Sequence, residues 1–284
     1  MEVSVPRILV ADDDRTTRLL LTETLRGEKF TVVAASDGEE TLDKIRNGKF
    51  DLVLLDVWMP KKTGIEVLAA LKDQKDRPKI IVMTSDDAPE TVLNAIREQA
   101  YQYIAKPFDP KVLVALLKET LGKGTDAMAI EVLSARPEWV ELVVPCTLEA
   151  AERIENFMSQ LKSGLSEEVR RSVGQAFHEL LLNAVEWGGK LDPNRKVRIS
   201  YLRAKRMLLY RIADPGPGFK VNELDHAAIS YSPDDPTSHD EVRREKGLRP
   251  GGFGLLLAQA NVDELLYNEA RNEVVFVKYL DGEG

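Results

Sequence analysis

Apolar runs in the first 106 residues are followed by polar side chains that could take part in chemistry. Asp12 and Asp13 follow "RILVA", Asp56 ends "DLVLLD", Thr84 ends "KIIVMT" and Lys106 follows "YQYIA". Three carboxylates at one place repel one another unless a divalent cation lies among them, and Mg²⁺ prefers carboxylate oxygens and water. We therefore predict an acidic pocket that holds Mg²⁺, with one ammonium group beside it.

A second group of candidate residues lies between positions 178 and 254. The helical pattern "HELLLNAVEWGG" carries Glu179 and Asn183, which are four residues apart and hence on one helical face. Either these two side chains pair with each other in the core, or they face a ligand. The glycine-rich turns "ADPGPGF" and "GGFGLLLAQA" follow. Such turns offer bare N–H groups and a helix dipole to a phosphate, although they can also simply end a loop. Their candidate residues are Asp214, Gly216, Gly218, Gly251, Gly252 and Gly254.

The elements that must position the first group alternate between short apolar runs and amphipathic helical patterns over residues 6–121. The predicted strands are "RILVAD", "FTVVAA", "DLVLLD", "KIIVMT" and "YQYIAK". Continuous apolar strands of this kind indicate a parallel, doubly wound α/β sheet, whose ligands bind at the carboxyl ends of the strands. Asp14 has a simpler alternative role, because an aspartate just before a helix is a common N-cap.

A glycine-containing segment, "GKGTDA" at residues 122–127, separates this pattern from the rest of the chain. We expect a first domain over 1–121, a linker over 122–127 and a second domain over 128–284. The second domain reads as strands "AIEVLSA" and "WVELVVPC", helices near 147–163 and 167–187, then strands "VRISYLRA" and "MLLYRIAD". Strands adjacent in sequence predict an α+β sandwich with an antiparallel or mixed sheet. The polar stretch 220–249 is long enough to be a lid over a ligand.

The composition argues against several classes of protein. The chain of 284 residues contains 39 Lys and Arg against 47 Asp and Glu, and residues 1–120 hold 18 of the basic and 21 of the acidic residues. Nucleic-acid binding would need clustered basic residues, so we expect no direct contact with DNA or RNA. The single cysteine, Cys146, excludes an internal disulfide. No secretion signal or long apolar segment is evident, which leads us to expect a cytoplasmic protein that does not enter a membrane.

The first half of the chain resembles the receiver domains of two-component response regulators over residues 5–121. The matching pieces are "ILVADDD", "DLVLLDVWMPKKTG", "IIVMTS" and "YIAKPF". The resemblance implies a flavodoxin-like fold in which Asp56 accepts a phosphoryl group from a histidine kinase or phosphotransfer protein. It also implies that Lys106 binds the phosphoryl oxygens, and that Mg²⁺ is held by Asp12, Asp13, Asp56 and the Trp58 carbonyl.

Two further residues would carry the phosphoryl signal in this comparison. Thr84 would hydrogen-bond the phosphoryl group, and Tyr103 matches the aromatic residue that family members reorient when that threonine moves. An ordinary strand aromatic is the alternative for Tyr103. The bulky side chain of Trp58 should change the lifetime of the phosphoryl group.

Residues 128–281 resemble the ATP-binding domain of gyrase-type ATPases, histidine kinases and anti-sigma serine kinases of the SpoIIAB and RsbW type, which is the GHKL or Bergerat fold. The resemblance implies that Asn183 binds Mg²⁺ on ATP, that Asp214 accepts from the adenine amino group, and that Glu179 is the general base. The glycines of the two turns would then lie around the nucleotide. His178 lies about 100° round the helix from Glu179, and we assign it to packing or the surface.

The chain also departs from this second family. Glu186 and Trp187 stand where many relatives have a basic residue, and "NEARNEVV" replaces the usual Gly-Thr before the last strand. Four cations of the predicted lid could supply positive charge or simply be solvated: Arg243, Arg244, Lys246 and Arg249. Nucleotide binding is therefore a firmer expectation than catalysis.

Together the two halves predict a regulator in which a receiver controls an anti-sigma-type serine/threonine kinase. Its partners would be a STAS-type anti-sigma antagonist, a sigma factor or both, and it could form a homodimer. Two alternatives stay open: a non-catalytic module in which ATP shapes a binding surface, and a phosphatase or trans-acting histidine kinase. The six-residue linker spans roughly 20 Å at most, which suggests that phosphorylation at Asp56 can act on the second domain.

Overall fold

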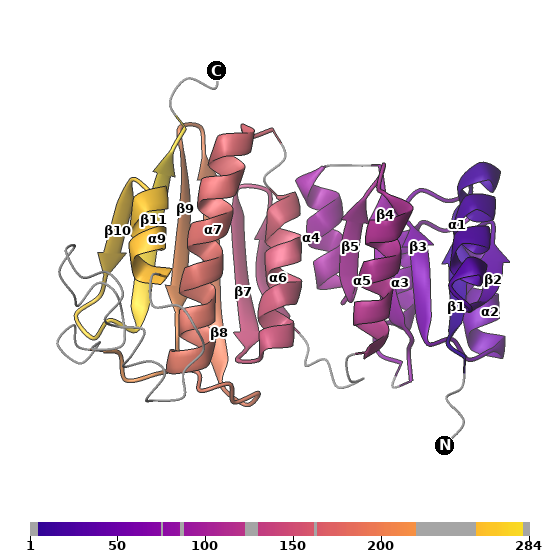
Figure 1. Ribbon diagram of the computed structural model, residues 1–284, viewed down its shortest axis with the longest axis horizontal. Helices are drawn as coiled ribbons and strands as arrows, with labels where there is room; N and C mark the ends of the chain where they lie inside the picture. Colours follow the sequence, from indigo (N-terminus) through magenta and orange to yellow (C-terminus); the bar gives the residue numbers. More distant parts are fainter. Residues whose placement is uncertain are drawn as a thin grey trace. The chain divides into compact units, whose positions relative to one another are not determined.

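The computed structural model divides the chain into two compact units, Met1–Ala127 and Met128–Gly284. It describes residues 5–74, 76–85, 88–122, 130–161, 164–219 and 254–280. Each unit has its own sheet, and Figure 1 shows the helices and strands of each.

The N-terminal unit is a five-stranded parallel sheet with the strand order β2-β1-β3-β4-β5. Five strands alternate with five helices along the chain, as the alternation of apolar runs and helical patterns predicts. The strands are β1 (Arg7–Ala11), β2 (Thr31–Ala35), β3 (Leu52–Asp56), β4 (Lys79–Thr84) and β5 (Gln102–Ala105). The helices are α1 (Arg15–Gly27), α2 (Gly38–Asn47), α3 (Gly64–Leu71), α4 (Pro89–Arg97) and α5 (Pro110–Gly122).

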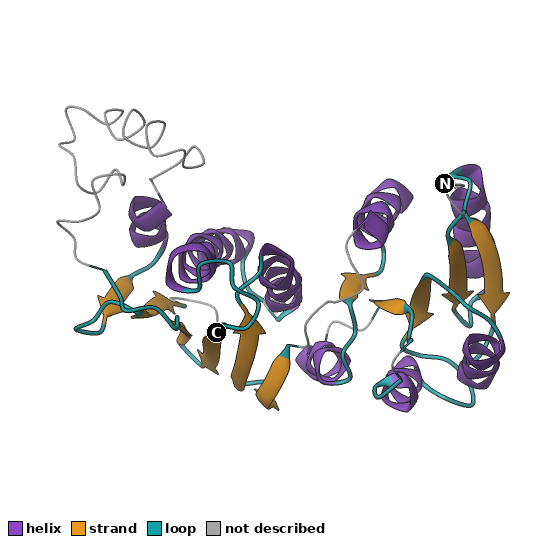
Figure 2. Ribbon diagram, turned by 90° about the horizontal axis from the view of Figure 1, so that it is seen from below, coloured by secondary structure: helices purple, strands orange, loops and turns teal. Residues whose placement is uncertain are grey.

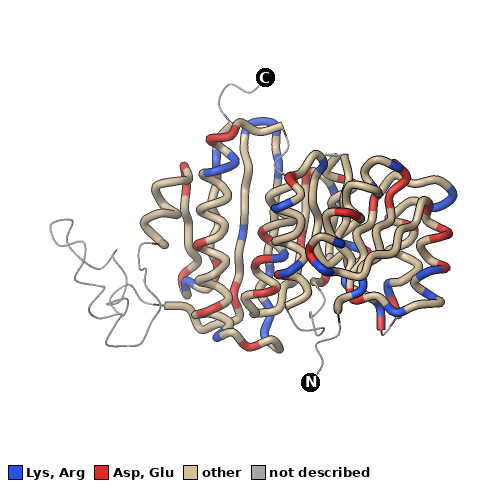
Figure 3. Tube along the Cα trace, turned by 45° about the vertical axis from the view of Figure 1, so that its right-hand side comes forward, with Lys and Arg blue, Asp and Glu red and all other residues tan. Residues whose placement is uncertain are grey.

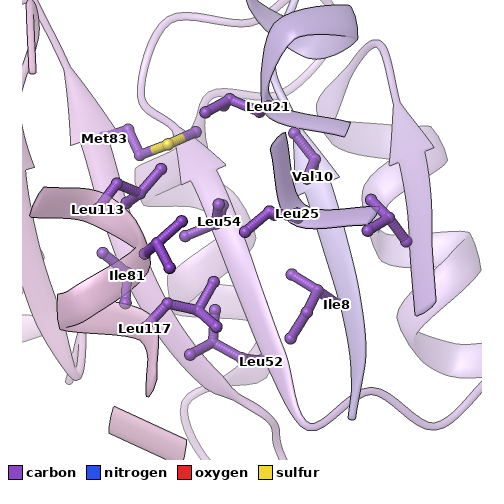
Figure 4. Packing of buried hydrophobic residues seen from close by; sticks show 12 residues of the cluster. Ile8, Val10, Leu21, Leu25, Leu52, Leu54, Ile81, Met83, Leu113 and Leu117 are labelled. Carbon is purple, nitrogen blue, oxygen red and sulfur yellow. The ribbon is translucent and has the colours of Figure 1, made fainter. Parts of the chain in front are cut away.

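Helices cover both faces of this sheet (Figure 2), which explains why its central strands are apolar without interruption. On one face, Leu21 and Leu25 of α1 and Leu113 and Leu117 of α5 pack around Leu54 of β3 (Figure 4). The opposite face is covered by the remaining helices, among which α2 contacts α3 and α3 contacts α4. Burial on both faces fixes the register of the strands and with it the positions of their carboxyl ends.

Local capping fixes where the helices beside the acidic pocket begin. Asp14 is the N-cap of α1 and accepts a hydrogen bond of 2.6 Å from the Thr17 N–H. Thr63 and Glu66 form a capping box at the start of α3. Asp14 therefore has a structural task, whereas Asp12 and Asp13 stay available to the pocket.

The C-terminal unit is a six-stranded antiparallel sheet with the order β10-β11-β9-β8-β7-β6. Its helices α6 (Leu148–Gln160), α7 (Glu167–Asn183) and α9 (Gly254–Asn261) lie on one face of the sheet (Figure 2). The strands are β6 (Glu131–Arg136), β7 (Trp139–Pro145), β8 (Lys196–Ala204), β9 (Met207–Ala213), β10 (Glu264–Tyr267) and β11 (Glu273–Tyr279). This is the α+β sandwich that the order of elements predicts.

Aromatic side chains join α7 to the sheet in this unit. The ring of Tyr210 on β9 stacks on Phe276 of β11, with centroids 4.8 Å apart, and lies 5.3 Å from Phe177 of α7. Aromatic pairs at these distances add to the energy of apolar burial. They fix α7 on the sheet, and α7 carries both Glu179 and Asn183.

The helix predicted over 167–187 is not one continuous α-helix. The α-helix ends at Asn183, and a π-helical turn, η1 (Ala184–Gly188), continues it. A π-turn accommodates one more residue per hydrogen-bonded ring than an α-helix, and such turns recur at functional sites.

Charged residues of both signs are interspersed along each unit (Figure 3). In the part of the chain that the structure describes, no helix is both long and apolar enough to cross a membrane.

Candidate functional site: an acidic pocket and the residues around α7

The acidic residues of the N-terminal unit come together at the carboxyl ends of β1 and β3. One carboxylate oxygen from each of Asp12, Asp13 and Asp56 lies within 4.8 Å of the other two. Asp12 and Asp56 are buried and Asp13 is exposed, so the pocket opens to solvent on one side. This is a donor set of hard oxygens with room for water, which fits Mg²⁺.

Lys106, just after β5, bridges two of these carboxylates. Its Nζ atom lies 2.7 Å from Asp12 Oδ2 and 2.7 Å from Asp56 Oδ1. Burial raises the pKa of Asp56; Lys106 lowers it in part, while the Asp12 and Asp13 charges add to the increase. Burial acts against the charge on Lys106, yet its hydrogen bonds to Asp12 and Asp56 hold the pKa of Lys106 above the usual value. A divalent cation would neutralise the excess negative charge that remains.

The other predicted residues of this pocket lie on neighbouring segments. Trp58 donates its N–H to Asp56 Oδ2 at 3.0 Å, while its side chain is 56% exposed. Thr84 ends β4 fully buried, and its carbonyl accepts from the Lys106 N–H at 2.7 Å. Tyr103 is buried on β5, where it pairs with Val82 of β4. The structure thus places Thr84 and Tyr103 on adjacent strands, with Thr84 at the pocket edge.

Arg18 is a residue of this pocket that the sequence analysis did not identify. One of its guanidinium nitrogens, Nη1, donates to the carbonyl of Asp12 at 2.6 Å and to the carbonyl of Asp13 at 2.7 Å. Side chains on a helix lean toward its N-terminus, so an arginine one turn after the N-cap Asp14 can reach the preceding loop. The spacing of four residues between Asp14 and Arg18 is the feature of the sequence that indicates this contact.

In the C-terminal unit, Glu179 and Asn183 lie on one face of α7 and are both half-buried. Within the described ranges, no hydrogen bond joins the Glu179 carboxylate to the Asn183 amide. A Cβ atom added at Gly254, the first residue of α9, would collide with Oε2 of Glu179. The start of α9 is therefore packed against the Glu179 carboxylate. Gly251, Gly252 and the predicted lid at 220–249 lie outside the described residues.

Asp214 leaves β9 and faces the end of the π-turn. Its Oδ1 atom accepts a 2.7 Å hydrogen bond from the Gly216 N–H. Burial raises the pKa of Asp214, against the lowering effects of that N–H group and of the Arg195 charge. Arg195 also donates to the Pro215 carbonyl at 2.6 Å. Within the described ranges only Oδ1 of this half-buried carboxylate accepts a hydrogen bond, which leaves Oδ2 suited to accept from an amino group.

Gly188 and Gly189 are further residues that the sequence analysis did not assign to the site. A Cβ atom at Gly188 would collide with the Asp214 carboxylate, and one at Gly189 would collide with Cys146 Sγ. The π-turn delivers these two glycines against Asp214 and Cys146. Two adjacent glycines at the end of a helical pattern were the signal for this close approach.

His178 lies next to Glu179 in sequence but points to another helix. Its Nδ1 atom lies 3.0 Å from each carboxylate oxygen of Glu155 on α6. This contact joins α6 to α7 at the surface and agrees with the packing or surface role predicted for His178.

Comparisons with known proteins match each unit to a family. Residues 8–118 match the response regulator receiver domain, and residues 144–278 match a histidine kinase-like ATPase domain. The DNA-binding response regulator MtrA of Mycobacterium tuberculosis is 33% identical over 208 residues, which cover 72% of this chain and 90% of that protein. The transcriptional regulatory protein CpxR of Escherichia coli is 41% identical over 118 residues, or 42% of this chain and 50% of that one.

The crystal structure of a CheY-like receiver domain protein from Methanospirillum hungatei covers 42% of this chain and 95% of that chain, with 32% identity and a TM-score of 0.41. The two family matches lie in one polypeptide, with the receiver domain first and the ATPase domain after it. The chain belongs to the response regulators, and its receiver domain is followed by a histidine kinase-like ATPase domain.

Proposed function

We propose that phosphorylation of Asp56 in the receiver domain controls an anti-sigma-type serine/threonine kinase activity of the ATPase domain. The observation that carries the proposal is the position of Glu179 and Asn183. Both are half-buried on one helix face, and they are not paired with each other. The start of α9 lies against Glu179, and Asp214 lies against Gly188 of the π-turn that continues α7. These contacts support the roles that we propose for them: Glu179 as the base, Asn183 as the metal ligand and Asp214 as the acceptor for adenine.

In the receiver, Asp56 acts as the nucleophile. A carboxylate oxygen of Asp56 attacks the phosphorus of a phosphohistidine, and the new P–O bond forms as the P–N bond breaks. The P–N electron pair returns to the histidine nitrogen, and a proton on the other ring nitrogen lets the imidazole leave as the neutral base. Asp12, Asp13, Asp56 and the Trp58 carbonyl would hold Mg²⁺, which supplies charge neutralisation for the transferring group. Lys106, which already contacts Asp56, moves its hydrogen bond to the phosphoryl oxygens.

In the ATPase domain, each residue has a distinct task. Asp214 would accept from the adenine amino group through Oδ2, and Asn183 would offer a neutral amide oxygen to the Mg²⁺ that ATP carries. Glu179 takes the proton from the attacking serine or threonine hydroxyl of a protein substrate. The start of α9, which lies against Glu179, would offer its N-terminal dipole to the phosphates.

A sigma factor or its STAS-type antagonist is the partner class that we propose for this domain. MtrA is DNA-binding by name, but here the residues after the receiver match an ATPase domain, and charges of both signs are interspersed along it. Glu186 and Trp187, which stand in place of a basic residue, favour the alternative in which ATP binds without phosphoryl transfer.

The test is to incubate the full-length protein with Mg²⁺ and radiolabelled ATP, together with each sigma factor and STAS-type protein of its host. Label on a serine or threonine of one partner, lost in Glu179→Gln, supports the kinase. ATP-dependent complex formation without label would replace the kinase with the binding module. Label on a histidine, or binding to a promoter DNA fragment with no protein partner, would overturn the proposal.

A further inference from the structure

Residues 268–272 form the turn between β10 and β11, which we call the asparagine turn, and they contact residues 214–219, the nucleotide loop, along its length. We infer that the side-chain amide of Asn272, oriented by Asn268, positions the Asp214 carboxylate and thereby sets the preference for adenine. Asn272 is thus a positioning residue. The inference rests on the proposed ATP site and extends it to a part of the chain where the sequence lacks the Gly-Thr of its relatives.

Asn272 binds the nucleotide loop on both sides of Pro215. Its backbone carbonyl accepts from the Asp214 N–H at 2.8 Å, and its Nδ2 donates to the Gly216 carbonyl at 3.0 Å. The first bond belongs to the backbone and would persist with any side chain. The second bond depends on the asparagine amide.

Gly216 connects the Asn272 amide to the Asp214 carboxylate. Its N–H donates to Asp214 Oδ1 at 2.7 Å, so the position of Gly216 fixes the orientation of the Asp214 side chain. One carboxylate oxygen is thereby held by the loop, and the other, which accepts no hydrogen bond among the described residues, can accept from a donor on the ligand. A base with an amino group gains from this orientation, whereas a base with an oxo group at that position does not.

Asn268 determines which way the Asn272 amide faces. Its Nδ2 donates to Asn272 Oδ1 at 2.8 Å, and its own Oδ1 accepts from the backbone N–H groups of Asn272 and Glu273 at 3.1 and 3.2 Å. Because Asn272 Oδ1 accepts from Asn268, the NH₂ end of the Asn272 amide points to Gly216. The two asparagines form one connected network.

Three other contacts place the loop without orienting its carboxylate. Gly218 has a φ of +83°, and a Cβ atom there would collide with the Ala270 carbonyl. Phe219 lies edge-on to Tyr267 with centroids 5.6 Å apart, and the Arg271 guanidinium lies 5.9 Å from the Phe219 ring centroid. These contacts hold the loop even when the Asn272 amide is removed, so a variant at Asn272 should still fold.

The experiment is a calorimetric titration of the full-length protein with ATP and with inosine triphosphate, which lacks the amino group. In Asn272→Ala we expect the Kd for ATP to rise about three- to tenfold, the size of one lost hydrogen bond. The Kd for inosine triphosphate should rise less, so that the preference for ATP falls. Asn268→Ala should change the preference in the same direction, and Asn194→Ala, whose amide donates to Asp192, should leave it unchanged.

Melting temperatures without nucleotide separate positioning from general stability. An equal loss of affinity for both nucleotides, tracking a fall in melting temperature, would reduce Asn272 to a structural residue. Unchanged affinity for both nucleotides in Asn272→Ala would also overturn the inference while leaving the ATP site in place. If the wild-type protein does not bind ATP at all, the proposed function fails together with this inference.

Discussion

The ammonium of Lys106 lies 2.7 Å from a carboxylate oxygen of Asp56. This contact brings a cation to the site of the incoming phosphoryl group, where it can stabilise charge in the transition state. We expect acetyl phosphate with Mg²⁺ to phosphorylate Asp56, and Lys106→Ala to slow the reaction by roughly a hundredfold, the usual effect of removing one such donor. Intact mass measured over time gives the rates. A phosphoryl adduct that persists on another residue in Asp56→Asn would contradict the assignment.

Arg18 should control how well the pocket binds its cation. Arg18→Ala removes two charge-assisted hydrogen bonds to the carbonyls of Asp12 and Asp13, which frees the loop that carries both carboxylates. We expect the Kd for Mg²⁺ to rise about tenfold, read from the fluorescence of Trp58. The exposed Arg15 of the same helix gives the control variant, Arg15→Ala. Equal Mg²⁺ affinity in Arg18→Ala and Arg15→Ala would rule out this role.

The positions of the pocket residues could be predicted because local signals and the fold agree. Continuous apolar runs indicate strands buried on both faces, and parallel strands bring Asp12, Asp56 and Lys106 to one edge. The contact from Arg18 to the loop is less evident, because many helix arginines are solvated. In the sequence, little distinguishes Arg18 from Arg15 of the same helix.

In the ATPase domain, some features depend on contacts between residues that are distant in sequence, and local patterns do not predict them. The pattern 167–187 has the apolar spacing of one helix, and the π-turn at Ala184–Gly188 depends on packing against Asp214 and Cys146, which are distant in sequence. The role of Asn272 likewise depends on contacts across the sheet. The strand β10 has only four residues, too few to show a periodicity.

Asn183 and Glu179 should have separable effects on the ATP site. Asn183→Ala removes the proposed Mg²⁺ ligand and should raise the Kd for Mg²⁺–ATP about tenfold or more, measured by calorimetry. Glu179→Gln keeps the side-chain shape that packs on Gly254, so ATP affinity should hold while phosphoryl transfer falls by roughly a hundredfold or more. Unchanged affinity in Asn183→Ala would remove the metal-ligand role, and full turnover in Glu179→Gln would remove the base.

ATP binding should weaken as the pH falls, because Asp214 becomes protonated. Burial raises the pKa of Asp214 above the ordinary value of 3.8, and only the ionised carboxylate is a full acceptor for the adenine amino group. Affinity should therefore be complete above the raised pKa and fall as the pH decreases through it. Because the phosphates of ATP also titrate, the pH profile of the wild type is compared with that of Asp214→Asn. This variant should bind ATP more weakly and should lack the part of the pH dependence that comes from Asp214. Parallel pH profiles in both proteins would contradict the prediction.

The claim that joins the two domains is that phosphorylation of Asp56 changes the behaviour of the ATPase domain. A difference of about 1.4 kcal/mol between the two receiver states would change ATP affinity tenfold. The most direct measurement is the Kd for Mg²⁺–ATP of the full-length protein with and without beryllofluoride, which mimics the phosphoryl group, in wild type and in Asp56→Asn. We predict that the mimic tightens ATP binding several-fold in wild type and has no effect in Asp56→Asn. The same Kd with and without the mimic in wild type, with the mimic shown to be bound, would contradict the coupling of receiver to ATP site.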